Sequence, residues 1–543
     1  MMIEALKALV VVLIVNAGAF VFARMAFREF LSPAVIDRWR NILLLSTVAA
    51  FLIPNFWLML VVIGVIAAMS SALETVRPAI YLLLLFAIPA ADQRVPGFFG
   101  INNFLNLAPF NVLALVVLFP LLGGSRETRD FRNVGGLADL CFIAFSVLSL
   151  ALAFRDTTAT DGIRRFAAYV LTAFGPYLAF SRYYWPKDRL AAGTLACLIP
   201  LIAIAGAAVV ETILHWHVYV NAVENWNIRF STRYLARSGL LRAYGPVFGP
   251  ITLGLYFVVA FSLALAFFAA AKRKLLPAIA VGAIGVGLIV TFSRGPWVGA
   301  AFAVFMIAAT AERPMAWFIR LVGVGFVATT VLLMTPFGPQ LFNMLPFVGE
   351  VESNTIDYRQ RLFEVGWAYV MKYPLFGSDG YLNAPELQSL VQGQGIIDIV
   401  NSYLQVALDR GIVGLALFVG VSLFAALSAM RAIGVARRFD NEYALYVQAW
   451  FAALMGVMLT LATTTNVNAQ IAETHWLLCG ICVGIARSVQ AVAAAKVNAF
   501  VDDEPPPGPP GGPEDPPPGR SLASARTLPA DNLPKHLRQY ADR

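Results

Sequence analysis

Charged residues are scarce in this chain of 543 residues, where Asp, Glu, Lys and Arg make up 13% and hydrophobic residues 59%. Soluble globular proteins carry about 25% charged and about 45–50% apolar residues. Long apolar runs recur from Ala8 to Val489. Because such runs need lipid around them, the composition excludes soluble enzymes and nucleic-acid binders. We expect an all-α polytopic membrane protein with about 12 to 15 transmembrane helices, in contact with membrane lipids and binding no nucleic acid.

Cysteine, histidine and intramembrane acids are also few. The four cysteines all lie within apolar stretches, which excludes a disulfide framework and offers no metal-ligand set. His215 and His217 share a loop, but two ligands without a third are weak evidence for a metal. The apolar segments contain essentially no Asp or Glu except at boundaries, as at Asp139 and Glu211, whereas ion-coupled carriers usually place acids inside their spans. We therefore expect no metal and no cofactor.

Basic residues outnumber acidic ones, 40 to 32, and from Arg126 onward they cluster at every second connection. The positive-inside rule assigns these clusters to the cytoplasm, which puts two long connections, about 211–250 and 335–401, outside. We predict a transmembrane domain over residues 1–495. The remaining residues, 496–543, predict a disordered Pro/Gly-rich cytoplasmic tail. The pair Pro54-Asn55 is compatible with either one kinked span or a tight hairpin.

The first outside connection holds arginines where the positive-inside rule predicts depletion. They are Arg229, Arg233, Arg237 and Arg242. Guanidinium groups stay charged and bind phosphate or carboxylate bidentately, so they indicate an anionic partner; solvated loop charge or contact with lipid headgroups is the alternative. Arg242 directly precedes Ala-Tyr-Gly-Pro-Val-Phe-Gly-Pro, where the backbone is broken at the membrane boundary. Such non-helical chain is tolerated mainly where it lines a cavity.

Arg294 stands in Thr-Phe-Ser-Arg-Gly-Pro-Trp, between two apolar segments, and Pro296 is well placed to open the next helix. The free N–H groups and the dipole of a helix N-terminus favour negative charge. An arginine beside that terminus predicts an anion site, although a hairpin-tip arginine can also be a solvated charge.

The second outside connection contains a stretch that begins at Asp357 and is amphipathic through Val370. We expect Leu362, Phe363, Trp367 and Val370 to form its apolar flank, and the segment to lie along the membrane surface. Arg359 or Arg361 then either points at the same anion or is a surface charge.

A polar stripe follows this connection. At helical spacing Asn401, Gln405 and Asp409 share one face, and Tyr403 lies on the opposite face. A polar stripe entering a membrane helix usually faces a wet cavity, but the periodicity is equally compatible with a polar helix end at the interface.

Three of these features together resemble the O-antigen ligase and Wzy-type polysaccharide polymerase superfamily: Asn401 to Gly414, the turn around Arg294, and Arg242 before its Gly/Pro-rich helix start. The resemblance implies a glycosyltransferase at the periplasmic face of a bacterial inner membrane. It implies an undecaprenyl-diphosphate-linked glycan as donor, and a second lipid-linked glycan or lipid A core as acceptor. In the family, the arginines matching Arg242 and Arg294 hold the donor diphosphate.

The chain departs from the family's H-N-x9-G-x-x-G pattern, because Val400 occupies the histidine position before Asn401. If a general base is used, Asp398, Glu364, Asp409 and His475 are the candidates. The missing histidine favours a polymerase of an exported polysaccharide; an O-antigen ligase and a small-solute transporter are the alternatives. The predicted catalytic residues are Arg242, Arg294, Asn401 and Asp398. The predicted substrate-binding residues are Arg359, Arg361, Arg237, Tyr403, Gln405, Asp409 and His475.

Overall fold

The computed structural model describes residues 2–97, 103–228, 236–237, 239–334, 353–391, 395, 397–465 and 469–502. The first part contains α1 (Met2–Ala26), α2 (Pro33–Leu52), α3 (Phe56–Leu73), α4 (Arg77–Leu85), β1 (Gln93–Pro96), β2 (Asn103–Leu107), α5 (Pro109–Leu113), α6 (Gly136–Ala153), α7 (Ala159–Tyr169), α8 (Gly175–Arg182), α9 (Lys187–Leu214) and α10 (Val220–Asn225). The second part contains β3 (Ala236–Arg237), β4 (Leu240–Leu241), α11 (Pro250–Ala270), α12 (Leu275–Val290), α13 (Arg294–Ala309), α14 (Pro314–Met334), α16 (Ser353–Val370), α17 (Pro385–Gln388), α18 (Ser402–Arg437), α19 (Asn441–Leu461) and α20 (Ala469–Asp502).

The protein is an all-α polytopic membrane protein, as its composition predicts. Within the described residues, eight helices are long and apolar enough to cross a membrane: α1, α3, α6, α9, α11, α18, α19 and most of α20. Shorter apolar helices occupy Pro109–Leu121, Leu275–Val290, Arg294–Ala309 and Pro314–Val327. The range of 12 to 15 spans stays a prediction, because it depends on how many of the shorter helices cross.

Contacts along the chain separate Met1–Ala494 from Ala495–Arg543, close to the predicted boundary at residue 495. Residues 496–502 of the predicted tail belong to helix α20, so the prediction of disorder was wrong there. The rest of the tail lies outside the described residues, and its disorder stays a prediction.

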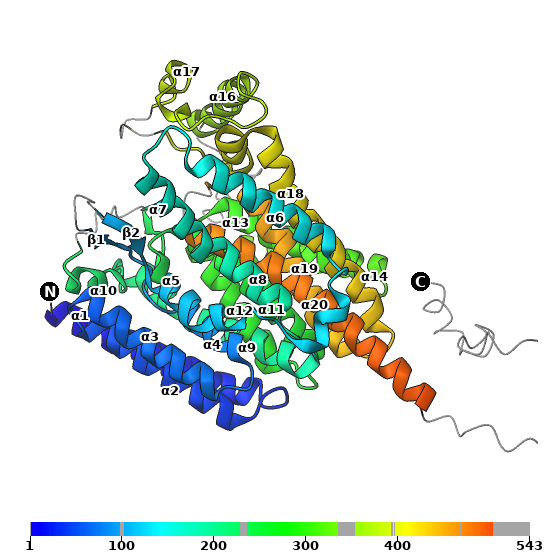
Figure 1. Cartoon of the computed structure of the whole chain (residues 1–543). Helices are drawn as coiled ribbons and strands as arrows, with labels where there is room; N and C mark the ends of the chain where they lie inside the picture. Colours follow the sequence, from blue (N-terminus) through cyan, green and yellow to red (C-terminus); the bar gives the residue numbers. More distant parts are fainter. Residues whose placement is uncertain are drawn as a thin grey trace, which may run out of the picture. The chain divides into compact units, whose positions relative to one another are not determined.

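Buried helices form the centre of the first unit, and apolar helices with exposed faces surround them (Figure 1). In α9, 83% of the most apolar 18-residue window is buried, against 28% in α6. Outward-facing apolar side chains such as Ile14 on α1, Val61 on α3 and Leu140 on α6 remain exposed. Lipid is as apolar as these side chains, so their exposure is expected in a membrane.

The segment around Pro54 is a hairpin and not a kinked span. Helix α2 ends at Leu52 and α3 begins at Phe56, and the two helices pack against each other. The side chain of Asn55 accepts a hydrogen bond of 3.0 Å from the backbone N–H of Leu58, so it caps the start of α3. A short antiparallel β1–β2 pair, absent from the sequence-based expectation, also interrupts the helices.

A small second hydrophobic cluster joins α16, the segment after it and the start of α18. Leu362 and Val370 are 2% and 1% exposed in this cluster, whereas Phe363 and Trp367 are 52% and 37% exposed. The expected apolar flank of this segment is therefore split between two sides of the helix. The expectation that all four side chains lie on the membrane surface was wrong for Leu362 and Val370, because the chain after α16 folds back and covers them.

Candidate functional site

The segment that carries Arg242 is held by a buried carboxylate. Glu211, near the end of α9, has no exposed surface. It accepts hydrogen bonds from the backbone N–H groups of Val218 at 3.1 Å, Tyr244 at 2.9 Å and Gly245 at 3.0 Å. Three such bonds satisfy the hydrogen-bonding capacity of a buried carboxylate. They fix both the chain that follows α9, at Val218, and the segment next to Arg242, at Tyr244 and Gly245. Sequence reasoning treated Glu211 only as a boundary residue.

Arg242 reaches the turn that precedes α13. Its Nε donates to the backbone carbonyl of Thr291 at 3.2 Å, and its Nη2 donates to the Oγ of Ser293 at 2.8 Å. Ser293 Oγ also lies 3.2 Å from the Thr291 carbonyl oxygen, to which it donates. Arg294 is the next residue and the first of α13. Arg242 and Arg294, which two helices, α11 and α12, separate in the sequence, thus lie near each other.

Close backbone packing fixes the start of α13 against α19. A Cβ atom on Gly295 would overlap Thr463, and one on Gly299 would overlap Thr460 and the backbone of Gly456. Small residues let membrane helices approach each other closely in this way. The N–H groups at the start of α13 are therefore held in place beside Arg242.

Arg359 of α16 joins this group and Arg361 does not. Desolvation lowers the pKa of Arg359 from its ordinary value, the carboxyl of Asp398 opposes that shift, and the positive charge of Arg294 adds to it. These electrostatic contacts bring Arg359, Asp398 and Arg294 into one neighbourhood. Arg359 and Arg361 are both exposed, and neither makes a hydrogen bond or ion pair within the described part of the chain, so the charges of Asp398 and Arg294 are what distinguish Arg359.

Asp398 is pinned through its backbone. The hydroxyl of Tyr358 donates to the Asp398 carbonyl oxygen at 3.0 Å and accepts from the Asp398 N–H at 3.1 Å. Burial raises the pKa of the Asp398 carboxyl above its ordinary value, and the charge of Arg359 opposes this shift. A carboxyl with a raised pKa beside an arginine is suited to accept a proton.

Asn401 acts on the backbone of its own helix. Its Oδ1 accepts hydrogen bonds from the N–H groups of Tyr403 at 3.0 Å and Leu404 at 3.2 Å, so it is the N-cap of α18. Val400, at the family's histidine position, packs against the second hydrophobic cluster. This position therefore contributes packing where the family pattern has a titratable ring.

The two glycines of the pattern have separate packing roles. Gly411 interrupts α18 with a φ of 68°, and a Cβ atom there would overlap the backbone of Leu375 and Phe376. The N–H of Ile412 donates to the Pro374 carbonyl at 2.7 Å in the same place. A Cβ atom on Gly414 would overlap the side chain of Arg410. The kink therefore docks the chain after α16 onto α18.

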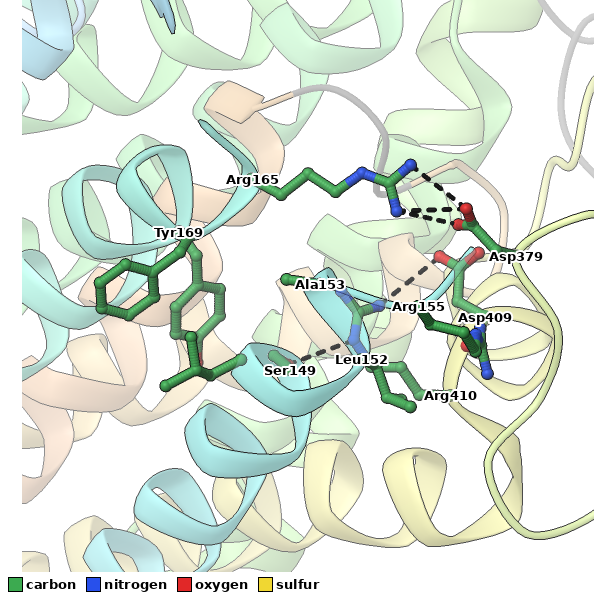
Figure 2. A pocket seen from close by; sticks show the side chains of 11 residues that line it. Ser149, Leu152, Ala153, Arg155, Arg165, Tyr169, Asp379, Asp409 and Arg410 are labelled. Atoms are coloured by element: carbon green, nitrogen blue, oxygen red, sulfur yellow. Dashed lines mark hydrogen bonds and ion pairs between the residues drawn. The ribbon is translucent and has the colours of Figure 1, made fainter. Parts of the chain in front are cut away.

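Gln405 and Asp409 both have polar neighbours. The hydroxyl of Thr465 donates to Gln405 Oε1 at 2.9 Å, and the Asp409 carboxylate lies 3.5 Å from Arg410 Nη1. Asp409 also lines a small cavity (Figure 2). Tyr403, on the other face, donates its hydroxyl hydrogen bond to the Met458 carbonyl at 2.7 Å.

Like Arg361, the predicted binding residues His475 and Arg237 have no described contact with Arg242, Arg294 or Arg359. His475 is fully buried, its Nε2 lies 2.7 Å from Ser422 Oγ, and its ring packs on Phe418 and Trp476. These contacts are structural, and α20 begins at Ala469, ahead of the apolar segment expected from Trp476. Arg237 lies in β3 opposite Leu240, and its side chain is outside what the structure describes.

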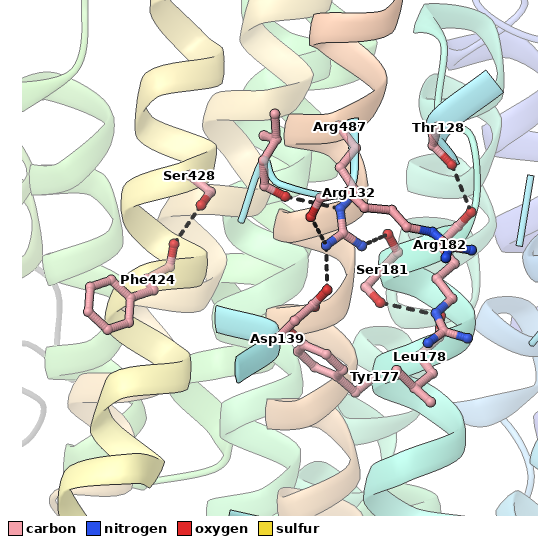
Figure 3. Close-up of polar contacts among 11 residues, drawn as sticks. Thr128, Arg132, Asp139, Tyr177, Leu178, Ser181, Arg182, Phe424, Ser428 and Arg487 are labelled. Carbon is pink, nitrogen blue, oxygen red and sulfur yellow. Dashed lines mark hydrogen bonds and ion pairs between the residues drawn. The ribbon is translucent and has the colours of Figure 1, made fainter. Parts of the chain in front are cut away.

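Sequence reasoning missed two buried ionic groups within the spans. Glu473 of α20 has no exposed surface and hydrogen-bonds the hydroxyl of Tyr81. Arg487 of the same helix, 1% exposed, pairs with Asp139 and donates to the backbone carbonyls of Arg132, Val134 and Ser181 (Figure 3). Glu473 precedes the apolar run and Arg487 interrupts it, so the local sequence gave only a weak signal for either.

Comparison with known families agrees with the motifs. Residues 278–419 match the family model Wzy_C, described as O-Antigen ligase. This match includes Arg294, Arg359, Asp398, Asn401 and Gly411, and it leaves out Arg242 and His475. No curated protein matches the chain. The predicted resemblance is confirmed over residues 278–419, which are similar to the O-antigen ligase family; the match spans 142 of the 543 residues.

Proposed function

We propose that this protein is a glycosyltransferase of an inner bacterial membrane that polymerises undecaprenyl-diphosphate-linked repeat units of an exported polysaccharide at the periplasmic face. The observation that carries this proposal is the hydrogen bond of Arg242 to Ser293, next to Arg294 at the start of α13, with Arg359 near enough for the charge of Arg294 to act on it. Guanidinium groups and a helix N-terminus both favour phosphate, and together they form a site for a diphosphate.

Glycosyl transfer requires a leaving group that accepts the electron pair of the broken bond and is stable as an anion. The acceptor hydroxyl attacks the anomeric carbon of the donor sugar, the bond from that carbon to the diphosphate oxygen breaks, and the electron pair leaves with the diphosphate. Arg294 and Arg359 neutralise the developing charge, and Arg242 positions Arg294 through the turn at Ser293. Asp398 takes the proton of the acceptor hydroxyl. No step in this scheme needs a metal or a cofactor.

The choice of polymerase over ligase rests on Val400. The family pattern places histidine there, and in this chain the position packs into the second hydrophobic cluster. An O-antigen ligase acting on lipid A core is the alternative. One observation favours the transport alternative: Glu473 is a buried carboxylate within a span, the kind of residue that marks ion pathways.

Deletion of the gene followed by analysis of surface glycans tests these alternatives. Single lipid-linked or core-linked repeats indicate a polymerase, and uncapped core with long lipid-linked chains indicates a ligase. Unchanged glycans favour transport. Complementation of the deletion with the Arg294→Ala variant should fail to restore the polymer. The Arg320→Ala variant is the control and should restore it, because Arg320 lies over the ring of Trp317 and is not part of the proposed site.

A further inference from the structure

A cavity of about 210 Å³ lies between the α6–α7 hairpin, the loop before α17 and the first turns of α18 (Figure 2). Its walls carry charged side chains from all three elements. They are Arg155, Arg165, Asp379, Asp409 and Arg410. Neither Arg242 nor Arg294 lines it. The cavity is therefore separate in its lining from the proposed diphosphate site.

Arg155 lines this cavity and is fixed by backbone carbonyls. Its guanidinium donates to the backbone carbonyls of Phe376 at 2.8 Å, Gly377 at 3.0 Å and Asp409 at 2.9 Å. Its Nε is buried and has no hydrogen-bond partner in the described part of the chain. Because this Nε is buried, it is the three carbonyl bonds that fix the guanidinium group at the cavity wall.

The other two arginines are held only in part by protein groups. Arg165 forms an ion pair of 3.1 Å with Asp379, with 45% and 32% of the two side chains exposed. Arg410 donates from Nε to the Ser149 hydroxyl at 3.2 Å, and its Nη1 is 3.5 Å from the Asp409 carboxylate. Guanidinium groups thus outnumber the carboxylates that line the cavity.

The remaining lining suits a ring. Phe166 and Tyr169 present aromatic side chains, and Leu150, Leu152 and Ala153 add apolar surface. The volume lies below the roughly 300–1,000 Å³ of pockets for drug-sized ligands, so it fits one ring and not a chain. An apolar wall with a few fixed polar groups and surplus positive charge matches a sugar ring that carries a carboxylate or a phosphate.

We propose that this cavity is a specificity site that binds one anionic sugar of the glycan substrate. This inference rests on the proposed function, because it assumes that the protein handles glycans. The sugar's anion contacts Arg165 and Arg410, and its apolar face lies on Tyr169.

The test is a saturation-transfer NMR titration of the full-length protein in lipid nanodiscs with D-glucuronate, glucose 1-phosphate, D-glucose and inorganic phosphate. We expect both anionic sugars to bind about tenfold more tightly than glucose, the factor for one charge-assisted hydrogen bond. Phosphate should bind more weakly than glucose 1-phosphate because it lacks the ring. Arg165→Gln should weaken anionic binding about tenfold. Arg164→Gln, a neighbouring arginine of α7 outside the cavity lining, should leave it unchanged.

Asp379→Asn supplies a test that misfolding cannot mimic. It removes the carboxylate that competes for Arg165, so anionic sugars should bind several-fold more tightly. The proposal is overturned if glucose binds as well as the anionic sugars, if nothing binds, or if Arg165→Gln and Asp379→Asn leave the affinity unchanged. Arg294→Ala should keep this binding while losing polymer. A failure of the transferase role is thus distinguishable from a failure of the sugar site.

Discussion

The hydrogen bond of 2.8 Å from Arg242 to the Ser293 hydroxyl leads to a double-mutant prediction. Ser293 is 2% exposed, so Arg242→Ala leaves a buried hydroxyl and a buried Thr291 carbonyl without their charged donor. A hydrogen bond to a charged group contributes about 1.5–3 kcal/mol, which is about 10–150-fold in rate. Removing one donor from an electrostatic site costs about 10²–10³-fold in rate. We therefore expect Ser293→Ala to slow transfer at least about tenfold and Arg242→Ala about 10²–10³-fold.

The double variant decides whether the contact acts as described. If Arg242 works by holding the turn through Ser293, the double variant is no slower than Arg242→Ala, because the second change removes nothing further. The assay is the rate of chain extension of a lipid-linked repeat unit by purified protein in nanodiscs. Ser428→Ala is the matched control and should keep the full rate, because within the described residues this hydroxyl bonds only to the Phe424 carbonyl of its own helix. Losses that multiply would refute the positioning role.

Three further changes have expected outcomes. Gly411→Ala should lower the free energy of unfolding by more than about 1–3 kcal/mol, because the φ of 68° and the close contact with the backbone of Leu375 and Phe376 exclude a Cβ atom. An unchanged denaturation midpoint would contradict the kink at Gly411. Arg359→Ala should slow chain extension about 10²-fold and Arg361→Ala should not, and equal rates would remove Arg359 from the site. Burial raises the pKa of Asp398, so its contribution to stability is present at acidic pH and is lost as pH rises through that pKa. Asp398→Asn should therefore be more stable than wild type near pH 7 but not near about pH 4, while wild-type transfer should fall on acidification as the base is protonated. Thermal unfolding and transfer rates across this range check both.

Helix class could be predicted because it depends on local signals, whereas the shared role of Arg242 and Arg294 was an expectation that came from the family resemblance. Long apolar runs specify spans; Arg294 is the first residue of α13, and Arg242 lies shortly before α11, which begins at Pro250. The departure at Val400 was also visible in the sequence. Its role in the second hydrophobic cluster was not, because it depends on chain that folds back from α16.

Other features required the tertiary structure. Arg359 and Arg361 are two residues apart on one helix, and only the packing of Leu362 and Val370 fixes how that helix is turned and which arginine lies nearer to the charges of Asp398 and Arg294. The amphipathic pattern alone predicted one apolar flank, whereas the structure buries Leu362 and Val370 and leaves Phe363 and Trp367 exposed. Glu473 stood outside the expected span because it precedes the apolar run, yet helix α20 begins earlier and buries it.

Binding of a polyprenyl diphosphate to the full-length protein in nanodiscs tests the central claim most directly. Wild type should bind the diphosphate more tightly than the corresponding monophosphate. Arg294→Ala and Arg359→Ala should each weaken diphosphate binding at least about tenfold, as expected for the loss of one charge-assisted hydrogen bond. Equal affinities for diphosphate in wild type and in both variants would contradict the assignment of these arginines to the leaving group.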